Sequence, residues 1–396
     1  MNIRLLAASF VISGLTAGSG WAQQGGFNPQ RIARDALSEP FTGMKRGEKL
    51  QEGLFHLRST GVPTTPVVNA AQAFVDSLTA GQRAKVLFPV DDPEWRNWAN
   101  IHRFRRQGVS LEEMTAAQRA NAYALLRVSL SAKGYETSRD IMRLNHHLGE
   151  LASNFDEYGE HLYWFTVMGN PSGTEPWGWQ IDGHHLIINY FVRGDQIVMT
   201  PTFMGSEPVH ARSGKYAGTS ILEAEQELGL RFMQSLPPEH QKMALMGQKQ
   251  GRSENIAEMF RDNVMVPLEG LRAGRLNGAQ REKLIELIDL YVGNIRDGHA
   301  AIKLDEVRAH IGDTYFAWKG GVGPDAVFYY RIHSPVIFIE FDHQGPIALD
   351  GPRRVPTRRH VHTVVRTPNG NDYGKDLLRQ HYEAHKNDPA HGHVPR

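Results

Sequence analysis

Two stretches of the chain repeat one pattern of strands at a constant distance, and this repeat constrains the fold more than any other feature. Apolar and aromatic residues alternate with other residues in four segments, at 177–181 and 186–189 in one half and at 328–332 and 337–340 in the other. Such alternation is typical of strands. Ile181 and Ile332 are 151 residues apart, and so are Ile188 and Ile339. A constant offset through two strands indicates internal duplication.

Segments that favour helices precede the strands in both halves. An Ala-Gln-Arg motif at 117–119 opens one apolar helix, and the same motif at 279–281 opens another. Apolar residues in both follow the i, i+3, i+4 spacing of a helix that faces a core. Short turns such as the one at Gly194 join neighbouring strands into antiparallel hairpins. The expected fold class is therefore α+β, with two similar helices-then-antiparallel-hairpin halves related by internal duplication.

These patterns divide the chain into five parts. We expect a signal peptide at 1–22, a linker or arm at 23–55, a first α+β half at 56–215, a second α+β half at 216–380 and a histidine-rich tail at 381–396. Thr200-Pro201 and Thr367-Pro368 close the two halves at a larger offset than the strands have. The second half is therefore predicted to carry an insertion at 344–359.

The first residues have the three parts of a secretory signal. Arg4 supplies a positive charge, an apolar segment follows at 5–15, and Gly20 and Ala22 are the small residues that precede a cleavage site. The apolar segment is shorter than the ~20 residues of a membrane helix. We expect a periplasmic or secreted protein with no membrane span after signal cleavage.

Composition narrows the chemistry that is open to this chain. The net charge is +1, which gives no electrostatic footprint for nucleic acid. There is no cysteine, so a metal site would have to use nitrogen and oxygen ligands. Histidine is abundant, at 19 residues, and its imidazole is a common metal ligand.

The first group of polar residues follows the Gly183 position. His184 and His185 stand at the start of a predicted strand, where successive side chains point to opposite faces. One interpretation is a binding floor in which His184 or His185 acts as general base or substrate ligand. Trp177, Trp179, Asn189 and Tyr330 would then contact the substrate. The other interpretation is a histidine pair packed in the core beside structural tryptophans.

The second group lies on two later strands. Glu340 and Asp342 share one face of a strand, and His360 and His362 share one face of what is predicted to be the next. If these strands pair in register, two carboxylates and two imidazoles converge into a set that suits zinc, copper, iron or manganese. Arg366 would lie on the same face and could hold an anionic substrate group. The alternative is a solvated outer face of an edge strand.

The tail contains further histidines. His381 and His385 have the i, i+4 spacing that can clamp a metal on a helix, and a solvated helix with a frayed end is the other interpretation.

Several of these motifs also carry a family resemblance. Trp177-Gly-Trp179, Gly183-His-His-Leu186, Ile339-Glu-Phe-Asp342 and His360-Val-His-Thr363 resemble the pattern of a bacterial family known as domain of unknown function 3500. The resemblance extends from about Asn69 to His381. It implies one long family domain and carries over no catalytic role.

Two functions remain open from the sequence, besides a structural envelope protein in which all these residues are simply packed. One is an exported metal-dependent hydrolase that acts on a small molecule, with Glu340, Asp342, His360 and His362 around a divalent ion that activates water. The other is a non-catalytic periplasmic protein that binds a carbohydrate or another small ligand on its aromatic side chains.

Overall fold

The computed structural model describes residues 28–249 and 251–387. The expected signal peptide at 1–22 lies outside these residues, as do His391 and His393 of the tail. Within the described part, no helix combines the length and the apolar character needed to cross a membrane.

The architecture is mixed α+β, as predicted. The helices are α1 (Pro29–Ser38), α2 (Thr65–Ser77), α3 (Ala80–Val86), α4 (Ala116–Ser129), α5 (Ala132–Ala152), α6 (Glu223–Ser235), α7 (Pro238–Ala244), α8 (Gly278–Val292), α9 (Asp297–Ala309) and α10 (Lys375–His385). The strands are β1 (Leu87–Phe88), β2 (Val109–Ser110), β3 (Tyr163–Met168), β4 (Trp177–Gly183), β5 (Leu186–Arg193), β6 (Gln196–Val198), β7 (Thr202–Ser206), β8 (Leu245–Gly247), β9 (Leu271–Arg272), β10 (Tyr315–Gly320), β11 (Phe328–His333), β12 (Phe338–His343) and β13 (Val361–Arg366).

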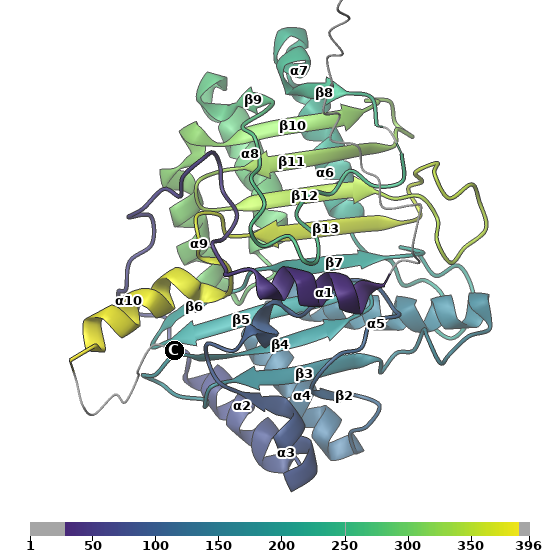
Figure 1. Ribbon diagram of the computed structural model, residues 1–396. Coiled ribbons are helices and arrows are strands. Elements are labelled where there is room, and N and C mark those ends of the chain that lie inside the picture. The colour runs from purple at the N-terminus through teal and green to yellow at the C-terminus, as the bar shows by residue number, and fades with distance from the viewer. Residues whose placement is uncertain (1–27, 250, 388–396) are drawn as a thin grey trace, which may run out of the picture.

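All the strands belong to one sheet whose main path is β1-β3-β4-β5-β7-β13-β12-β11-β10-β8 (Figure 1). β7 and β13 pair antiparallel at its centre, in a register that sets His362 opposite Gly205. Outward from this pair, the path reads β5, β4, β3, β1 on one side and β12, β11, β10, β8 on the other. The sheet therefore joins the first and second halves of the chain along the β7–β13 seam.

The Ala-Gln-Arg motifs begin helices for the same local reason in both halves. Thr115 caps α4 and Gln118 bonds back to it, while Asn277 and Gln280 form the same reciprocal capping box at α8. A capping box satisfies two backbone N–H groups that the first helical turn leaves without partners. The repeated glutamine thus fixes where these helices start.

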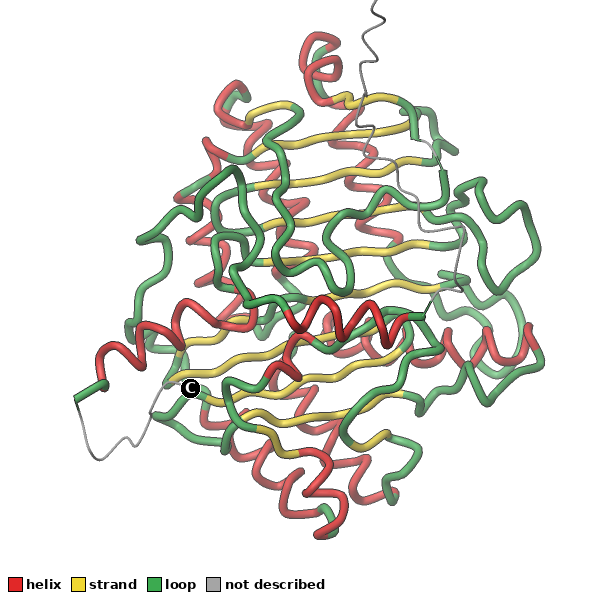
Figure 2. The backbone as a smooth tube through the Cα atoms, viewed as in Figure 1, coloured by secondary structure: helices red, strands yellow, loops and turns green. Residues whose placement is uncertain are grey.

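Both faces of the sheet are covered. Figure 1 shows α4, α5, α6, α8 and α9 behind the sheet, while α1, α10 and long coil segments cross its front. The tube in Figure 2 shows how much of that front cover is coil rather than helix. Every residue of β4, β11 and β12 is buried as a result. Both faces of these strands are therefore buried. The alternating sequence pattern does not mark one face of the sheet as solvated.

The expected linker at 23–55 contains a fixed helix in its described part. The Asn28 side chain caps the N-terminus of α1. At the other end, Arg96 donates to the carbonyl oxygens of Ala36 and Glu39 at 2.9 Å each. Because Arg96 binds these carbonyl groups, the C-terminal end of α1 is held in place.

The predicted insertion at 344–359 is a coil segment, drawn yellow-green at the right of Figure 1. The Glu207 carboxylate accepts backbone N–H groups from Ile347, Ala348 and Leu349, at 2.8, 3.1 and 3.2 Å. This buried carboxylate, at the end of β7, therefore anchors the insertion beside the seam.

Candidate metal centre

Three histidine side chains meet where the two halves of the sheet join. The Nε2 atoms of His185 and His362 are 3.1 Å apart, those of His185 and His360 are 3.3 Å apart, and those of His360 and His362 are 2.9 Å apart. All three residues are buried. The triad draws its first member from the first half of the chain and the other two from the second.

The backbone brings these imidazoles together across one glycine. His184 and His185 occupy the turn between β4 and β5, not a strand as expected, and His185 has a φ of +66°. Positive φ is uncommon for residues other than glycine, and histidine is among the types that adopt it more often. Gly205 of β7 lies between the His185 turn and His362, because its N–H donates to the His185 carbonyl oxygen at 2.9 Å. A Cβ at Gly205 would lie 3.2 Å from His362 Cδ2 and 2.5 Å from Val361 O, so glycine leaves the rings room to meet.

Two of the imidazoles are oriented through their second nitrogen. His362 Nδ1 lies 2.7 Å from Glu258 Oε1, and His360 Nδ1 lies 3.0 Å from the Gly345 carbonyl oxygen. A carbonyl oxygen only accepts, and so does an ionised carboxylate, so each Nδ1 carries the proton. Metal-binding histidines are oriented by outer partners in this way. A neutral ring then presents a bare Nε2 lone pair to the centre of the triad.

With the protons on Nδ1, the three Nε2 atoms have too few protons to form hydrogen bonds with one another. The lone pairs of His360 and His362 face each other at 2.9 Å, and a proton on His185 Nε2 can be donated to only one of them. Three nitrogens bound to zinc at 2.0–2.1 Å in tetrahedral geometry would be ~3.3 Å apart, and an octahedral face at the same bond length would give ~2.9 Å. A cation bound between the three Nε2 atoms would fit their spacing and would take the place of the missing protons.

The electrostatic surroundings keep the His185 and His360 rings neutral. Burial, followed by the neighbouring His184 and His362, holds the pKa of His185 well below its usual range. Burial and the His362 ring do the same to the pKa of His360. Neutral imidazole is the form that binds metal. For Glu258, burial favours the protonated form, but His362 and Asn255 outweigh burial, and its pKa is lowered.

The carboxylates expected to complete the ligand set have other partners. Glu340 accepts the N–H groups of Ile256 and Ala257, at 2.9 and 3.0 Å, and the Tyr329 hydroxyl at 2.7 Å. Asp342 pairs with Lys249 and accepts the Glu254 N–H. Burial raises the pKa of Glu340 to about 7 and that of Asp342 to about 6. Neither carboxylate belongs to the imidazole group.

Arg366 is likewise bonded to structural partners. Its Nε donates to Ala257 O at 2.8 Å and its Nη2 to Glu258 O at 3.0 Å. Its Nη1 pairs with Asp262 and Asp372, at 2.9 and 3.1 Å. Arg366, Glu340 and Asp342 therefore hold the coil segment that carries Glu258. They act on the triad through that segment.

Glu258 is the partner of the triad that the sequence did not reveal. Its neighbours 253–258 carry no periodic pattern and no motif. It reaches His362 from a coil segment 104 residues away in the chain. No local signal in the sequence marks it.

The other predicted site residues lie apart from the Nε2 triangle. Trp177, Trp179 and Tyr330 are fully buried core residues, and Asn189 bonds Gln180 and the Pro201 carbonyl. These four side chains therefore do not form an open binding floor. The His184 ring stacks on the His185 ring, with centroids 3.9 Å apart, and lines a pocket of about 370 Å³.

In the tail, His381 is buried near the end of α10. Its carbonyl oxygen lies 2.8 Å from His385 Nδ1. Within residues 28–249 and 251–387, the triad is the one group of three or more ligand side chains that could hold a metal ion, and these two histidines are not part of it.

Comparison with known proteins gives a family and no further relatives. No curated protein and no solved structure matches the chain. The family model described as "Protein of unknown function (DUF3500)" matches residues 60–375, which include β1 to β13, the triad and Glu258. The chain therefore belongs to the DUF3500 family of proteins of unknown function.

Proposed function

We propose that this protein is a metal-dependent hydrolase in which His185, His360 and His362 hold one divalent ion. The observation that carries the proposal is the triangle of Nε2 atoms, 2.9 to 3.3 Å on a side, whose lone pairs have too few protons between them. A bound cation would satisfy all three nitrogens at once. Glu258 and the Gly345 carbonyl would keep two of the rings in the ligand orientation.

The number of protein ligands supports catalysis over a purely structural role. Structural zinc sites close the coordination shell with four protein ligands, whereas catalytic sites use three and keep one position for water or substrate. In the described part of the chain no fourth histidine or carboxylate joins the triad. A metal in such a site supplies an activated water at neutral pH.

The ligand type narrows the choice of metal. Three imidazole nitrogens suit zinc, copper or iron, while magnesium, calcium and manganese favour oxygen ligands. With Glu340 and Asp342 turned to the 254–257 segment, the oxygen ligands that would favour manganese are not in the set. We expect zinc, copper or iron.

Untagged protein, purified without chelator, should contain about one zinc, copper or iron atom per chain by plasma mass spectrometry, as one three-histidine site holds one ion. The same protein should hydrolyse p-nitrophenyl esters or phosphates faster than its chelator-treated form. Protein that contains no metal, and whose melting temperature ignores added zinc, copper and iron, would contradict the metal site. Metal binding without hydrolysis of either substrate class would contradict only the hydrolase.

Glu258→Gln tests the outer support of the site. The amide keeps the shape of the carboxylate but removes the charge that stabilises the His362 ring as a donor. Metal affinity should fall about 10- to 100-fold, as for other partners of metal-binding histidines. Glu239→Gln, on the surface helix α7, is a matched control that should leave affinity unchanged. Unchanged metal affinity in Glu258→Gln would show that this carboxylate has no part in binding.

We also infer that the two halves of the chain arose by duplication. The inference is supported by the order of elements, which is α2-α3-β1-β2-α4-α5-β3-β4-β5-β7 in one half and α6-α7-β8-β9-α8-α9-β10-β11-β12-β13 in the other. The 151-residue offset of the strands agrees with it. The triad is not repeated in this scheme, since it is shared across the seam.

Export of the protein is a further proposal, supported by the signal pattern that ends at Ala22. Protein recovered from the periplasm or medium should begin at Gln23 when its N-terminus is sequenced. An N-terminus at Met1 in a cytoplasmic fraction would contradict export.

A further inference from the structure

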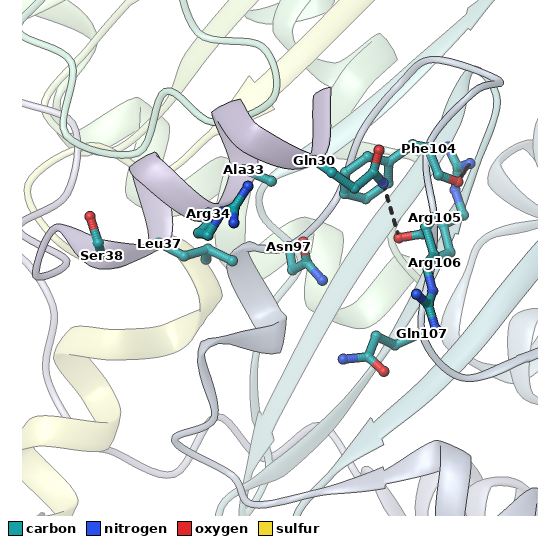
Figure 3. Close-up of a pocket in the computed structure, with 10 residues that line it drawn as sticks. All are labelled: Gln30, Ala33, Arg34, Leu37, Ser38, Asn97, Phe104, Arg105, Arg106 and Gln107. Carbon is teal, nitrogen blue, oxygen red and sulfur yellow. Dashed lines mark hydrogen bonds between the residues drawn. The ribbon is translucent and has the colours of Figure 1, made fainter. Parts of the chain in front are cut away.

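A separate pocket of about 490 Å³ lies between α1 and the coil at 97–107 (Figure 3). This volume falls within the about 300–1,000 Å³ of sites for small molecules. None of its lining residues belongs to the imidazole triad. A role for this pocket therefore does not depend on the metal proposal.

The walls of the pocket are fixed before any ligand arrives. Arg96 binds the C-terminal carbonyls of α1 and pairs with Asp262 at 2.8 Å. Figure 3 shows Gln30 of α1 reaching across to the coil, where its Nε2 donates to Arg105 O at 3.5 Å. A pocket with preset walls loses less entropy on binding than one that must close.

The lining has an unbalanced charge. It contains three arginines and three carboxamides, but no carboxylate: Arg34, Arg105, Arg106, Gln30, Asn97 and Gln107. Arg106 is neutralised, because its Nε lies 3.2 Å from Asp182. Arg34 and Arg105 have no carboxylate within 4.0 Å in the described structure. Two guanidinium groups thus remain available to an anion.

Glu94, a buried acid beside the pocket, does not oppose an anion. Asn97 Nδ2 donates to Glu94 Oε2 at 2.9 Å, so Glu94 lies just behind the pocket wall. Burial raises the pKa of Glu94 to about 8, which leaves this carboxyl largely protonated at neutral pH. The electrostatic potential in the pocket is therefore set by Arg34 and Arg105.

We propose that this pocket binds a small hydroxylated organic anion, a molecule with hydroxyl groups and one carboxylate or phosphate group. A guanidinium group binds a carboxylate or a phosphate through paired N–H donors, and Arg34 and Arg105 would bind the anionic group in this way. The carboxamides of Gln30, Asn97 and Gln107 offer donors and acceptors to hydroxyl groups. Leu37 and Phe104 supply the apolar surface that covers carbon–hydrogen faces.

Calorimetric titration with three sugars tests the proposal. D-glucuronate carries a carboxylate, glucose 6-phosphate carries a phosphate, and glucose carries neither. At least one acidic sugar should bind about tenfold or more tightly than glucose, because a hydrogen bond to a charged group is worth at least that factor. Whichever acidic sugar binds identifies the oxyanion.

Variants separate the pocket from general surface charge. The double variant Arg34→Gln, Arg105→Gln should lose the preference for the acidic sugar, and it should fold normally because both side chains are exposed. Arg31→Gln removes the same charge from α1 but lies outside the lining, so the preference should remain. Metal-depleted protein should also keep it. Equal binding of acidic and neutral sugars, no binding of any, or a preference that survives in the double variant would overturn the proposal.

Discussion

His360→Ala should abolish metal binding and the stability that comes with it. The change removes one of three ligands, and two imidazoles alone make a poor site. When free metal exceeds the dissociation constant a thousandfold, a bound ion stabilises the folded protein by about 4 kcal/mol. Wild-type protein should therefore gain this amount when zinc is added, as measured by chemical unfolding, and His360→Ala should gain almost nothing.

The same experiment in chelator distinguishes a metal site from a merely packed histidine cluster. Without metal, the wild-type protein retains the crowded contact between His360 and His362 at 2.9 Å. Removal of one ring relieves that contact, which offsets the loss of the hydrogen bond to Gly345. We expect the two proteins to differ by less than about 1–2 kcal/mol in chelator. His333→Ala, buried in β11 apart from the triad, should keep the full response to zinc. Equal responses in wild type and His360→Ala would refute the assignment.

Arg366→Met should have the largest effect on stability with or without metal. Its guanidinium is fully buried between Asp262 and Asp372 and also holds the carbonyls of Ala257 and Glu258. Methionine fills part of the space but leaves carboxylates buried with less compensation. Removal of one partner from a buried ion pair costs about 3–5 kcal/mol. The free energy of unfolding, measured by urea denaturation, should fall by that amount.

A surface pair provides the control for Arg366. Arg308 and Glu282 form an ion pair at 2.8 Å, but both side chains are about half exposed. Arg308→Met should cost less than about 1 kcal/mol because water screens such pairs. If Arg366→Met cost no more than Arg308→Met, the buried network would not hold the Glu258 segment in place.

The sequence predicted the regular elements well because they are encoded locally. Alternation gave the strands around Ile181 and Ile332, and the Ala-Gln-Arg motifs gave the starts of α4 and α8. The α+β class with antiparallel hairpins follows from these elements and is confirmed. The sequence pattern at His184 and His185 predicts a strand, and only the left-handed backbone of His185 distinguishes the turn that forms there.

The site was predicted only in part, because the coil segment at 254–258 that contacts it has no periodic sequence pattern. Glu340 and Asp342 do share a face, as alternation requires, but backbone N–H groups of 254–257 occupy them. Likewise, the aromatics at Trp177 and Trp179 alternate as a half-exposed strand would. They are buried because coil and helices cover both faces. Which side of a strand faces water depends on segments far away in the chain.

The seam between β7 and β13 has a consequence for the order in which the protein assembles. His185 and His362 are 177 residues apart, so all three histidines are present only late in the synthesis of the chain. A chain that emerges from its N-terminus can complete β3, β4 and β5 while the triad still has one member. Contacts between such distant segments form slowly, since a long loop must close first. Metal capture would then mark the end of folding, after both halves have docked.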